Sequence, residues 1–176
     1  TSSTYESGIY TIVIFFKPPI NRRNPMNLSF VSDSEIKSEY LNRFTLKRGD
    51  KIQSSNDAIM QFQSLMVANA EKEEFYCLFL SGNNSVITIE KLFEGSISSS
   101  AVYPRQIIKR VLELNALALI IAHNHPSGNL NPSQDDLNIT KRIKNALELV
   151  DCVLHDHLII GYGKNDVYSF TDHGLI

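Results

Sequence analysis

The stretch that decides the fold reads AHNHPSGNLNPSQDD and occupies residues 122–136. It follows a short apolar run, ALALIIA at 116–122, which has the length and composition of a buried strand. The proline and glycine residues after the second histidine interrupt regular structure and predict a loop. Ser133 then has the chemistry of a helix N-cap, and a helix is expected over about 134–149. This segment therefore predicts a strand, a loop and a helix in that order.

Two histidines and an aspartate in this stretch are spaced to bind a metal ion. His123 and His125 stand two residues apart at the end of the strand, where alternation places both imidazoles on one side. The loop lets the chain turn back, so that Asp136 in the first helical turn presents its carboxylate to the same point. Two imidazoles and one carboxylate are typical of a Zn²⁺ site with an open fourth position. A lone histidine is more often an ordinary polar residue, but the three together favour a metal site.

Outward from this stretch, the patterns predict a mixed sheet with helices on both sides, an α/β (α+β) domain. Helices are expected at 56–71 and 104–114, where apolar residues recur at helical spacing. Further strands are expected at 75–80, 85–92, 152–161 and 166–170. The first two of these should form a hairpin around the turn Ser81 to Asn84. A short strand and a loop are expected at 95–100.

The first part of the chain differs from the rest. Residues 1–55 are expected to form a small, mostly helical extension, with a strand at 9–16 and a helix from Ser32 to about Phe44. The pair Ser32 and Glu35 predicts a capping box at the start of that helix. Residues 56–176 are then the main domain.

Composition narrows the class of protein. With 43% hydrophobic and 20% charged residues in 176, the chain is expected to be a globular protein with a packed core. No apolar run reaches the roughly 18 residues of a membrane span, and no signal sequence is visible, so no membrane partner is expected. Cys77 and Cys152 lie in apolar runs, which favours buried thiols and a cytoplasmic location. The net charge of −2 does not favour a dedicated nucleic-acid binder, although a local basic patch stays open.

A metal site of this kind also needs a general base that is not itself a ligand. Three acidic residues near the expected strands are candidates. Glu73 and Glu74 precede the strand at 75–80, and Glu90 lies in its hairpin partner. The residues alone do not choose among them.

The spacing His123-x-His125-x7-Ser133-x2-Asp136 resembles the JAMM (MPN+) metallopeptidase motif. The wider sequence is similar to the RadC-like branch of the JAB domain superfamily over roughly residues 57–175. The pieces that carry this resemblance are spread along the domain: Glu73-Glu74-Phe75, Phe93-x-Gly95, Tyr103-Pro104-Arg105, His123 to Gly128, Pro132-Ser133, Asp136, Thr140 and Asp156 to Ile159.

The resemblance implies a JAB/MPN-like fold and a zinc-dependent hydrolase of amide or isopeptide bonds. Its substrate would be a protein or peptide, with a ubiquitin-like conjugate among the candidates. The residues His123, His125 and Asp136 match the zinc ligands of the family. Oligomeric state is not indicated.

The resemblance also implies two catalytic side chains. Glu73 matches the family's catalytic glutamate from the E-x-F spacing, with Glu74 as the alternative. Ser133 matches the residue whose hydroxyl helps to hold the oxyanion, and an N-cap role is open beside it. Asn124 stands between the histidines, where peptidase branches usually carry Ser or Thr and RadC-like members carry Asn.

Two other functions compete with hydrolysis. One is a DNA-associated protein of the RadC type, although residues 1–55 lack the glycine-rich helix-hairpin-helix segments that longer RadC-type proteins carry. The other is a non-catalytic interaction module. His155 and His157 repeat the two-residue spacing but lack a third ligand, so a packing or supporting role is expected for His157. A Ser127 nucleophile is not favoured because no G-x-S-x-G elbow is present.

Overall fold

The computed structural model describes residues 45–66, 72–95, 102–163 and 166–176, and five residues before them (Ser32, Glu35, Ile36, Ser38 and Glu39). From residue 45 onward, the described helices are α2 (Ser55–Met66), α3 (Pro104–Leu114) and α4 (Gln134–Glu148). The described residues Glu35, Ile36, Ser38 and Glu39 are also helical. The strands are β1 (Glu74–Leu80), β2 (Val86–Glu94), β3 (Ala118–Asn124), β4 (Val153–Ile160) and β5 (Val167–Ser169).

The five strands form one mixed sheet in the order β2-β1-β3-β4-β5. The β3–β4 pair is parallel, and the other three pairs are antiparallel. The predicted hairpin is therefore present as β1 and β2. The α+β class and the mixed sheet flanked by helices, both predicted from the sequence, are confirmed.

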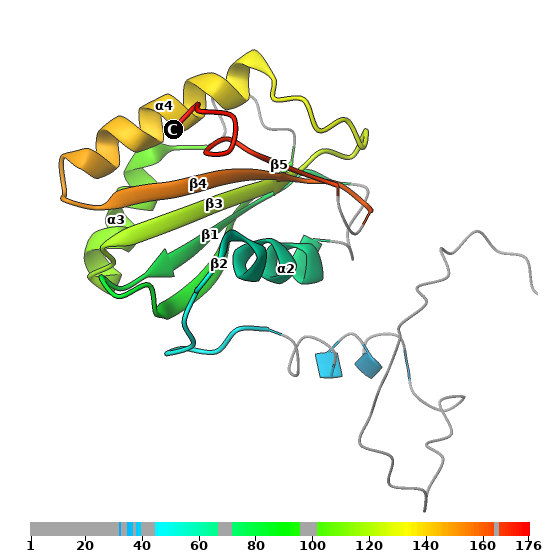
Figure 1. The fold of residues 1–176 in the computed structure, drawn as a ribbon, viewed down its shortest axis with the longest axis horizontal. Coiled ribbons are helices and arrows are strands. Elements are labelled where there is room, and N and C mark those ends of the chain that lie inside the picture. The colour runs from blue at the N-terminus through cyan, green and yellow to red at the C-terminus, as the bar shows by residue number, and fades with distance from the viewer. Residues whose placement is uncertain are drawn as a thin grey trace, which may run out of the picture.

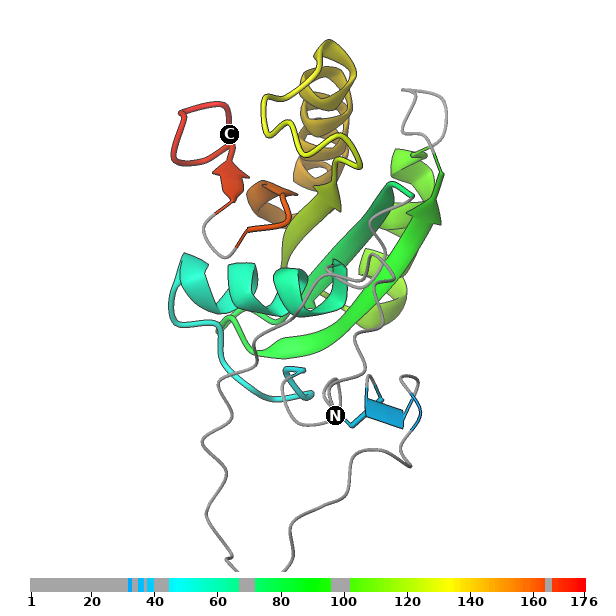
Figure 2. The same ribbon diagram turned by 90° about the vertical axis from the view of Figure 1, so that its right-hand side faces the viewer.

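Helices cover both faces of the sheet (Figures 1 and 2). On one face, Phe75, Cys77 and Phe79 of β1 pack with residues of α3 and α4. On the other face, Leu78 and Leu80 pack with α2. Because both faces of β1 and β3 are buried, these strands have continuous apolar sequences rather than alternating ones. Both cysteines are buried free thiols, as predicted.

Strand β3 starts and ends two residues later than the sequence predicted. The difference arises at the end of α3, where Asn115 takes a left-handed conformation with φ 52°. The N–H of Ala116 then bonds to the carbonyl of Val111, 3.0 Å away, and closes the helix terminus. The residues up to Leu117 therefore belong to the connection, and His123 lies inside the strand with His125 just beyond its end.

Strand β4 contains an irregularity that affects the site. Leu119 of β3 pairs with Leu154, but Ile120 pairs with Asp156, so His155 is an extra residue on β4. An extra residue shifts the alternation of the strand by one position. As a result, Leu154 and His157 both face α3 and α4 although they are three residues apart.

Some predicted elements lie outside the described residues. These are the strand at 9–16, most of the helix at 32–44, the end of the helix at 56–71 and the segment 96–100. At Ser32 the predicted capping box is formed: its amide donates to Glu35 Oε2 over 2.8 Å, and its hydroxyl accepts from the Glu35 amide over 3.3 Å. No helix among the described residues is long and apolar enough to cross a membrane.

Candidate metal centre

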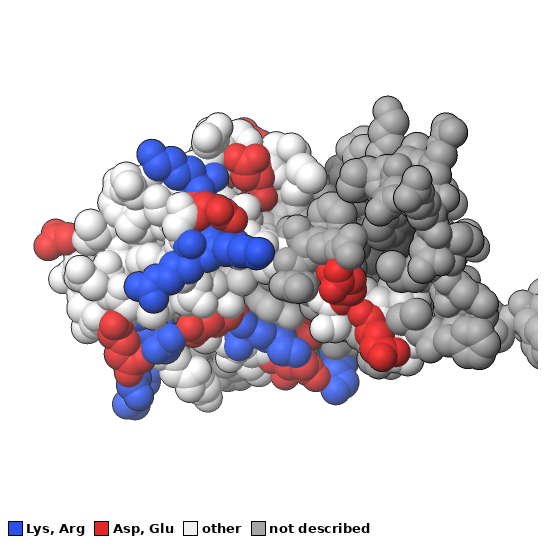
Figure 3. Space-filling model, turned by 90° about the horizontal axis from the view of Figure 1, so that it is seen from below, with Lys and Arg blue, Asp and Glu red and all other residues white. Residues whose placement is uncertain are grey.

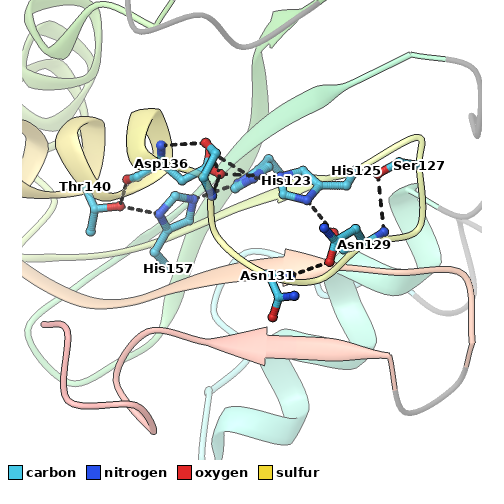
Figure 4. Close-up of polar contacts among 9 residues, drawn as sticks. His123, His125, Ser127, Asn129, Asn131, Asp136, Thr140 and His157 are labelled. Carbon is cyan, nitrogen blue, oxygen red and sulfur yellow. Dashed lines mark hydrogen bonds and ion pairs between the residues drawn. The ribbon is translucent and has the colours of Figure 1, made fainter.

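The three predicted ligands meet where the C-terminal end of β3 faces the N-terminus of α4 (Figure 4). The side chains of His123 and Asp136 are buried, at 0% and 2% exposure. The side chain of His125 is 15% exposed. Solvent therefore reaches the site from the side of His125.

The distances among the donor atoms fit a tetrahedral ion. His123 Nε2 lies 3.3 Å from Asp136 Oδ1, and His125 Nε2 lies 3.5 Å from Asp136 Oδ2. The two Nε2 atoms are 2.9 Å apart. Zinc bonds of about 2.0–2.1 Å in tetrahedral geometry require donor atoms about 3.3 Å apart. The two distances to Asp136 go to different oxygens, so the carboxylate would have to turn for one oxygen to bind the ion. The two histidines and Asp136 are then close enough to hold a zinc ion together.

Ser133, which the sequence predicted as the N-cap of α4, fixes Asp136 through a capping box. The Ser133 hydroxyl accepts from the Asp136 amide over 3.1 Å, and the Ser133 amide donates to Asp136 Oδ2 over 2.7 Å. The hydroxyl also donates to Asp136 Oδ2 over 2.7 Å. Oδ2 is thereby held by the helix terminus, and the carboxylate is aimed at the histidines.

The Nδ1 atoms of His123 and His125 both form hydrogen bonds on the side away from Asp136. His125 Nδ1 lies 2.5 Å from the carbonyl oxygen of Asn129, which can only accept, so Nδ1 carries the proton. His123 Nδ1 lies 2.8 Å from Nε2 of His157. The Nδ1 of His157 in turn lies 2.6 Å from Thr140 Oγ1. These contacts leave the Nε2 atoms of His123 and His125 facing Asp136.

The electrostatics of the site suit a cation. Burial lowers the pKa of His123 to about 4, which keeps this imidazole neutral. The hydrogen bond with Asp136 raises the pKa of His125. Burial pushes the pKa of Asp136 upward, but the contacts with His125, His123 and Ser133 outweigh it and hold that pKa well below its ordinary value. The site therefore keeps an ionised carboxylate beside two imidazoles.

The structure separates the three candidate bases. A carboxylate oxygen of Glu73 and one nitrogen each of His123 and His125 all lie within 4.8 Å of one another. Glu74 points to the opposite face and pairs with Lys91, with Oε1 and Nζ 2.8 Å apart. Glu90 is bound by Arg110 Nε over 2.9 Å. Only Glu73 of these three is placed to act at the metal site or to become a further ligand.

The side chain of Asn124 points away from the two histidines and bonds to the backbone that leads into β1. Its Oδ1 accepts from the amide of Glu74 over 2.7 Å, and its Nδ2 donates to the carbonyl of Lys72 over 2.9 Å. The carboxamide therefore holds the backbone on both sides of Glu73. The sequence showed that Asn124 differs from the peptidase pattern but did not show this contact.

Two other side chains do not join the site. His155 is exposed, and its Nε2 lies 3.0 Å from Asn84 Oδ1, so it forms no metal pair with His157. The hydroxyl of Ser127 accepts from the Asn129 amide over 3.3 Å and shapes the loop. By contrast, His157 is fully buried against His123, a closer involvement than its sequence spacing indicated.

Comparison with known proteins agrees with the fold. The family model described as the RadC-like JAB domain matches residues 52–175. The chain belongs to the RadC-like JAB domain family. The match covers every labelled helix and strand and all the residues of the candidate metal centre.

Relatives of this RadC-like JAB domain come from several bacteria. A UPF0758 protein of Photobacterium profundum is 50% identical over 75% of this chain and 58% of its own length. The UPF0758 protein YfjY of Escherichia coli is 49% identical over 70% of this chain and 76% of its own. A UPF0758 protein of Vibrio vulnificus is 46% identical over 81% of this chain and 62% of its own. The chain thus spans about three fifths of the Photobacterium and Vibrio proteins, and these names state no activity.

Proposed function

We propose that this RadC-like JAB domain is a zinc-dependent hydrolase of amide or isopeptide bonds in a protein or peptide substrate. One observation carries the proposal. The Nε2 atoms of His123 and His125 face each other at 2.9 Å, while their Nδ1 atoms contact His157 and the Asn129 carbonyl. Two lone pairs at this distance repel unless a cation or a proton lies between them, and Asp136 supplies the balancing negative charge.

When bound, a zinc ion supplies a Lewis acid that polarises a carbonyl and lowers the pKa of water. His123, His125 and Asp136 would hold it. The side of the site at His125 is open to solvent, as a fourth position for water requires.

Glu73 is the proposed general base. Its carboxylate lies close enough to both histidines to accept a proton from a water molecule between them. The same carboxyl group would then donate that proton to the nitrogen of the leaving amine. The Ser133 hydroxyl is the proposed donor to the oxyanion, which requires it to turn away from Asp136 Oδ2.

Zinc binding tests the metal site directly. The purified protein should contain about one zinc per chain or take it up, measured by metal analysis and by competition with a coloured chelator. His125→Ala should lose this zinc and keep its circular dichroism spectrum. His155→Ala is the matched control, because His155 is exposed and bonded to Asn84 away from the site. A wild-type protein that binds no zinc would end the proposal.

Hydrolysis is tested with a panel of peptides and ubiquitin-like conjugates incubated with the zinc-loaded protein. Glu73→Gln should abolish any cleavage and retain zinc. Glu148→Gln removes an exposed carboxylate at the end of α4 and should leave cleavage unchanged. Cleavage that persists in Glu73→Gln would exclude Glu73 as the base.

A nucleic-acid function is the alternative, and the charges on the face shown in Figure 3 give it little support. On the face in Figure 3, Lys and Arg side chains are interleaved with Asp and Glu. Several of these charges are paired, such as Lys72 with Glu94 over 2.8 Å and Arg110 with Glu90. Interleaved and paired charges give no extended positive field for phosphates on this face of the described residues. Salt-sensitive retention of the protein on DNA would favour the alternative.

A further inference from the structure

Two buried side chains behind the candidate metal site connect His123 to the backbone of α4 (Figure 4). The hydroxyl of Thr140 donates to the carbonyl oxygen of Asp136, over 2.5 Å. His157 Nδ1 lies 2.6 Å from this hydroxyl, and His157 Nε2 lies 2.8 Å from His123 Nδ1. Thr140 and His157 are both buried. The chain of contacts therefore ends on the backbone of one metal ligand and the side chain of another.

The position of each proton in this series of hydrogen bonds follows from the Thr140 hydroxyl, which is the first donor. A hydroxyl has one proton, and Thr140 gives it to the Asp136 carbonyl, so the hydroxyl must accept from His157 Nδ1. A neutral imidazole carries one proton, so His157 Nε2 is left as an acceptor. It must then accept from His123 Nδ1. His123 consequently presents an unprotonated Nε2 to the metal site, the form that zinc requires.

The ring of His157 is also held in place by its neighbours. It stacks on Phe170, with centroids 4.5 Å apart and planes at 25°. The edge-on ring of Phe75 lies on it with centroids 6.0 Å apart. The extra residue His155 in β4 turns His157 toward this face of the sheet. Rotation of the imidazole into another hydrogen-bonding arrangement is therefore blocked by packing.

We infer that Thr140 and His157 are positioning residues that set the tautomer of His123 and so prepare it to bind the metal. The inference rests on the proposed zinc site but concerns residues that do not touch the ion. The Thr140 hydroxyl sets the tautomers of both histidines. Its proton is already donated to the Asp136 carbonyl, so it can only accept from His157.

Removal of the Thr140 hydroxyl should reverse the proton positions on His157 and His123. In Thr140→Val, Nδ1 of His157 loses its acceptor, and a buried N–H without an acceptor is unfavourable. His157 is then expected to carry its proton on Nε2 and donate it to His123 Nδ1. His123 must place its own proton on Nε2, where it points at the metal site. Zinc binding then has to reverse both tautomers.

The tautomers are read directly in the zinc-free protein by long-range ¹H–¹⁵N NMR of the histidine rings. His123 and His157 should both carry their proton on Nδ1 in the wild-type protein. In Thr140→Val both should shift to Nε2, and Thr140→Ser should restore the wild-type pattern. A wild-type His123 protonated on Nε2 would overturn the inference even if Thr140→Val did not fold.

Zinc affinity, measured by chelator competition, gives the second readout. Thr140→Val should weaken zinc binding by about 10- to 100-fold, the usual effect of losing a residue that orients a ligand. Thr140→Ser should bind as the wild type does. Ser64→Ala is the matched control, because the Ser64 hydroxyl also donates to a carbonyl of its own helix, that of Gln61 over 2.7 Å, but lies in α2 on the other face of the sheet. Ser64→Ala should leave zinc affinity unchanged.

The outcomes separate this inference from the proposed function. If the wild type shows the Nδ1 tautomers and binds no zinc, the zinc hydrolase proposal fails. The control of the His123 tautomer by Thr140 and His157 then still stands. If the wild type binds zinc and Thr140→Val binds it equally well, the positioning role fails and the zinc site stands. An equal loss of affinity in Ser64→Ala and Thr140→Val would show a general effect of removing a helical hydroxyl and contradict the positioning role.

Discussion

At the candidate site, consecutive residues at the end of β3 point to opposite faces of the sheet and have different roles. His123 and His125 face Asp136, and Asn124 between them reaches the backbone at Lys72 and Glu74. Alternation along an extended chain makes this division possible, because neighbouring side chains point to opposite faces. The histidines therefore face the proposed metal position, while Asn124 fixes the segment that carries Glu73.

Asn124→Ala should reduce catalysis without affecting metal binding. Loss of the carboxamide frees the backbone on both sides of Glu73, so the base is held less well, whereas no ligand contact is removed. With a substrate identified from the panel, we expect kcat to fall by about 10- to 100-fold, with KM and zinc content unchanged. This is only part of the roughly 10²- to 10⁴-fold that general acid–base catalysis contributes, because Glu73 is still present but held less well. Steady-state kinetics and metal analysis measure the three quantities.

Asn124→Ser tests whether the residue type used by peptidase branches can replace the carboxamide. A single hydroxyl is too short to contact both Lys72 and Glu74, so only part of the activity should return. If Asn124→Ala cleaved as fast as the wild type, the contacts at Lys72 and Glu74 would have no catalytic role.

Tyr76 gives the fold a dependence on alkaline pH. Its hydroxyl lies 3.4 Å from Glu74 Oε2, beside the start of β1. Burial, with a further contribution from Glu74, raises the pKa of Tyr76 to about 12. In the unfolded chain a tyrosine titrates near pH 10, so above that pH the unfolded state loses its proton first. The stabilisation by Tyr76 is therefore complete below about pH 10 and is lost as pH rises toward 12.

We expect this loss to be on the order of 1–2 kcal/mol of unfolding free energy. Urea denaturation at pH 8, 10 and 11.5 measures it in the wild type and in Tyr76→Phe, which lacks the ionisable group. The wild type should lose more stability than the variant between the first and last pH. Parallel losses in the two proteins would assign the pH dependence to other groups.

At the scale of elements, the N-terminus of α4 both begins a helix and aims a ligand. The Ser133 hydroxyl and amide bind Asp136, so the capping box and the position of the carboxylate are one arrangement. Ser133→Ala should lower the unfolding free energy of the zinc-free protein by about 1 kcal/mol, the usual cost of a lost N-cap. Chemical denaturation measures this, and Ser127→Ala in the preceding loop should change it little.

Ser133→Asn separates the cap from catalysis, because asparagine caps helices as well as serine does but has no hydroxyl. Stability should be retained in this variant. If the hydroxyl assists hydrolysis, cleavage should fall although the helix is capped. Unchanged cleavage in Ser133→Asn would leave Ser133 with the capping role alone.

The sequence predicted those features that depend on local spacing. His123, His125, Ser133 and Asp136 lie within one strand, loop and helix, so their meeting point followed from periodicity and capping. The contact of His157 with His123 did not follow, because it depends on the parallel β3–β4 pairing and on the extra residue His155. The Asn124 contact likewise requires β1 to lie beside β3 with Phe75 opposite His123. Such register is set by the packing of the whole sheet.

At the scale of the whole molecule, the site lies at one end of the central strands and the chain enters at the other. His123 and Glu74 mark the site end of β3 and β1, whereas Leu80 and Ala118 pair at the opposite end. Near that opposite end, the amide of Gly49 bonds to the carbonyl of Val86 over 2.8 Å. The entering segment is therefore joined to the sheet at a distance from the candidate metal centre.

The contacts of residues 49–52 indicate where the domain begins. The sequence placed the boundary after residue 55, yet three backbone bonds tie residues 49–52 to the start of β2 and its turn. Besides Gly49, the amide of Val86 donates to the carbonyl of Asp50 over 2.7 Å, and the amide of Ile52 donates to the carbonyl of Asn84 over 3.0 Å. Leu46 and Ile52 also pack against the core under α2. These contacts favour a domain that includes residues 45–54.

A chain that begins at Thr45 should therefore be more stable than one that begins at Ser55. Three backbone hydrogen bonds at about 1 kcal/mol each give an expected difference of about 3 kcal/mol in unfolding free energy, before the lost apolar contacts are counted. Urea denaturation of the two truncated chains measures the difference. Zinc affinity should be equal in both, because the lost contacts lie at the end of the sheet opposite His123. Equal stabilities would place the boundary at residue 55, and a loss of zinc binding from the shorter chain alone would show that the two ends of the sheet are coupled.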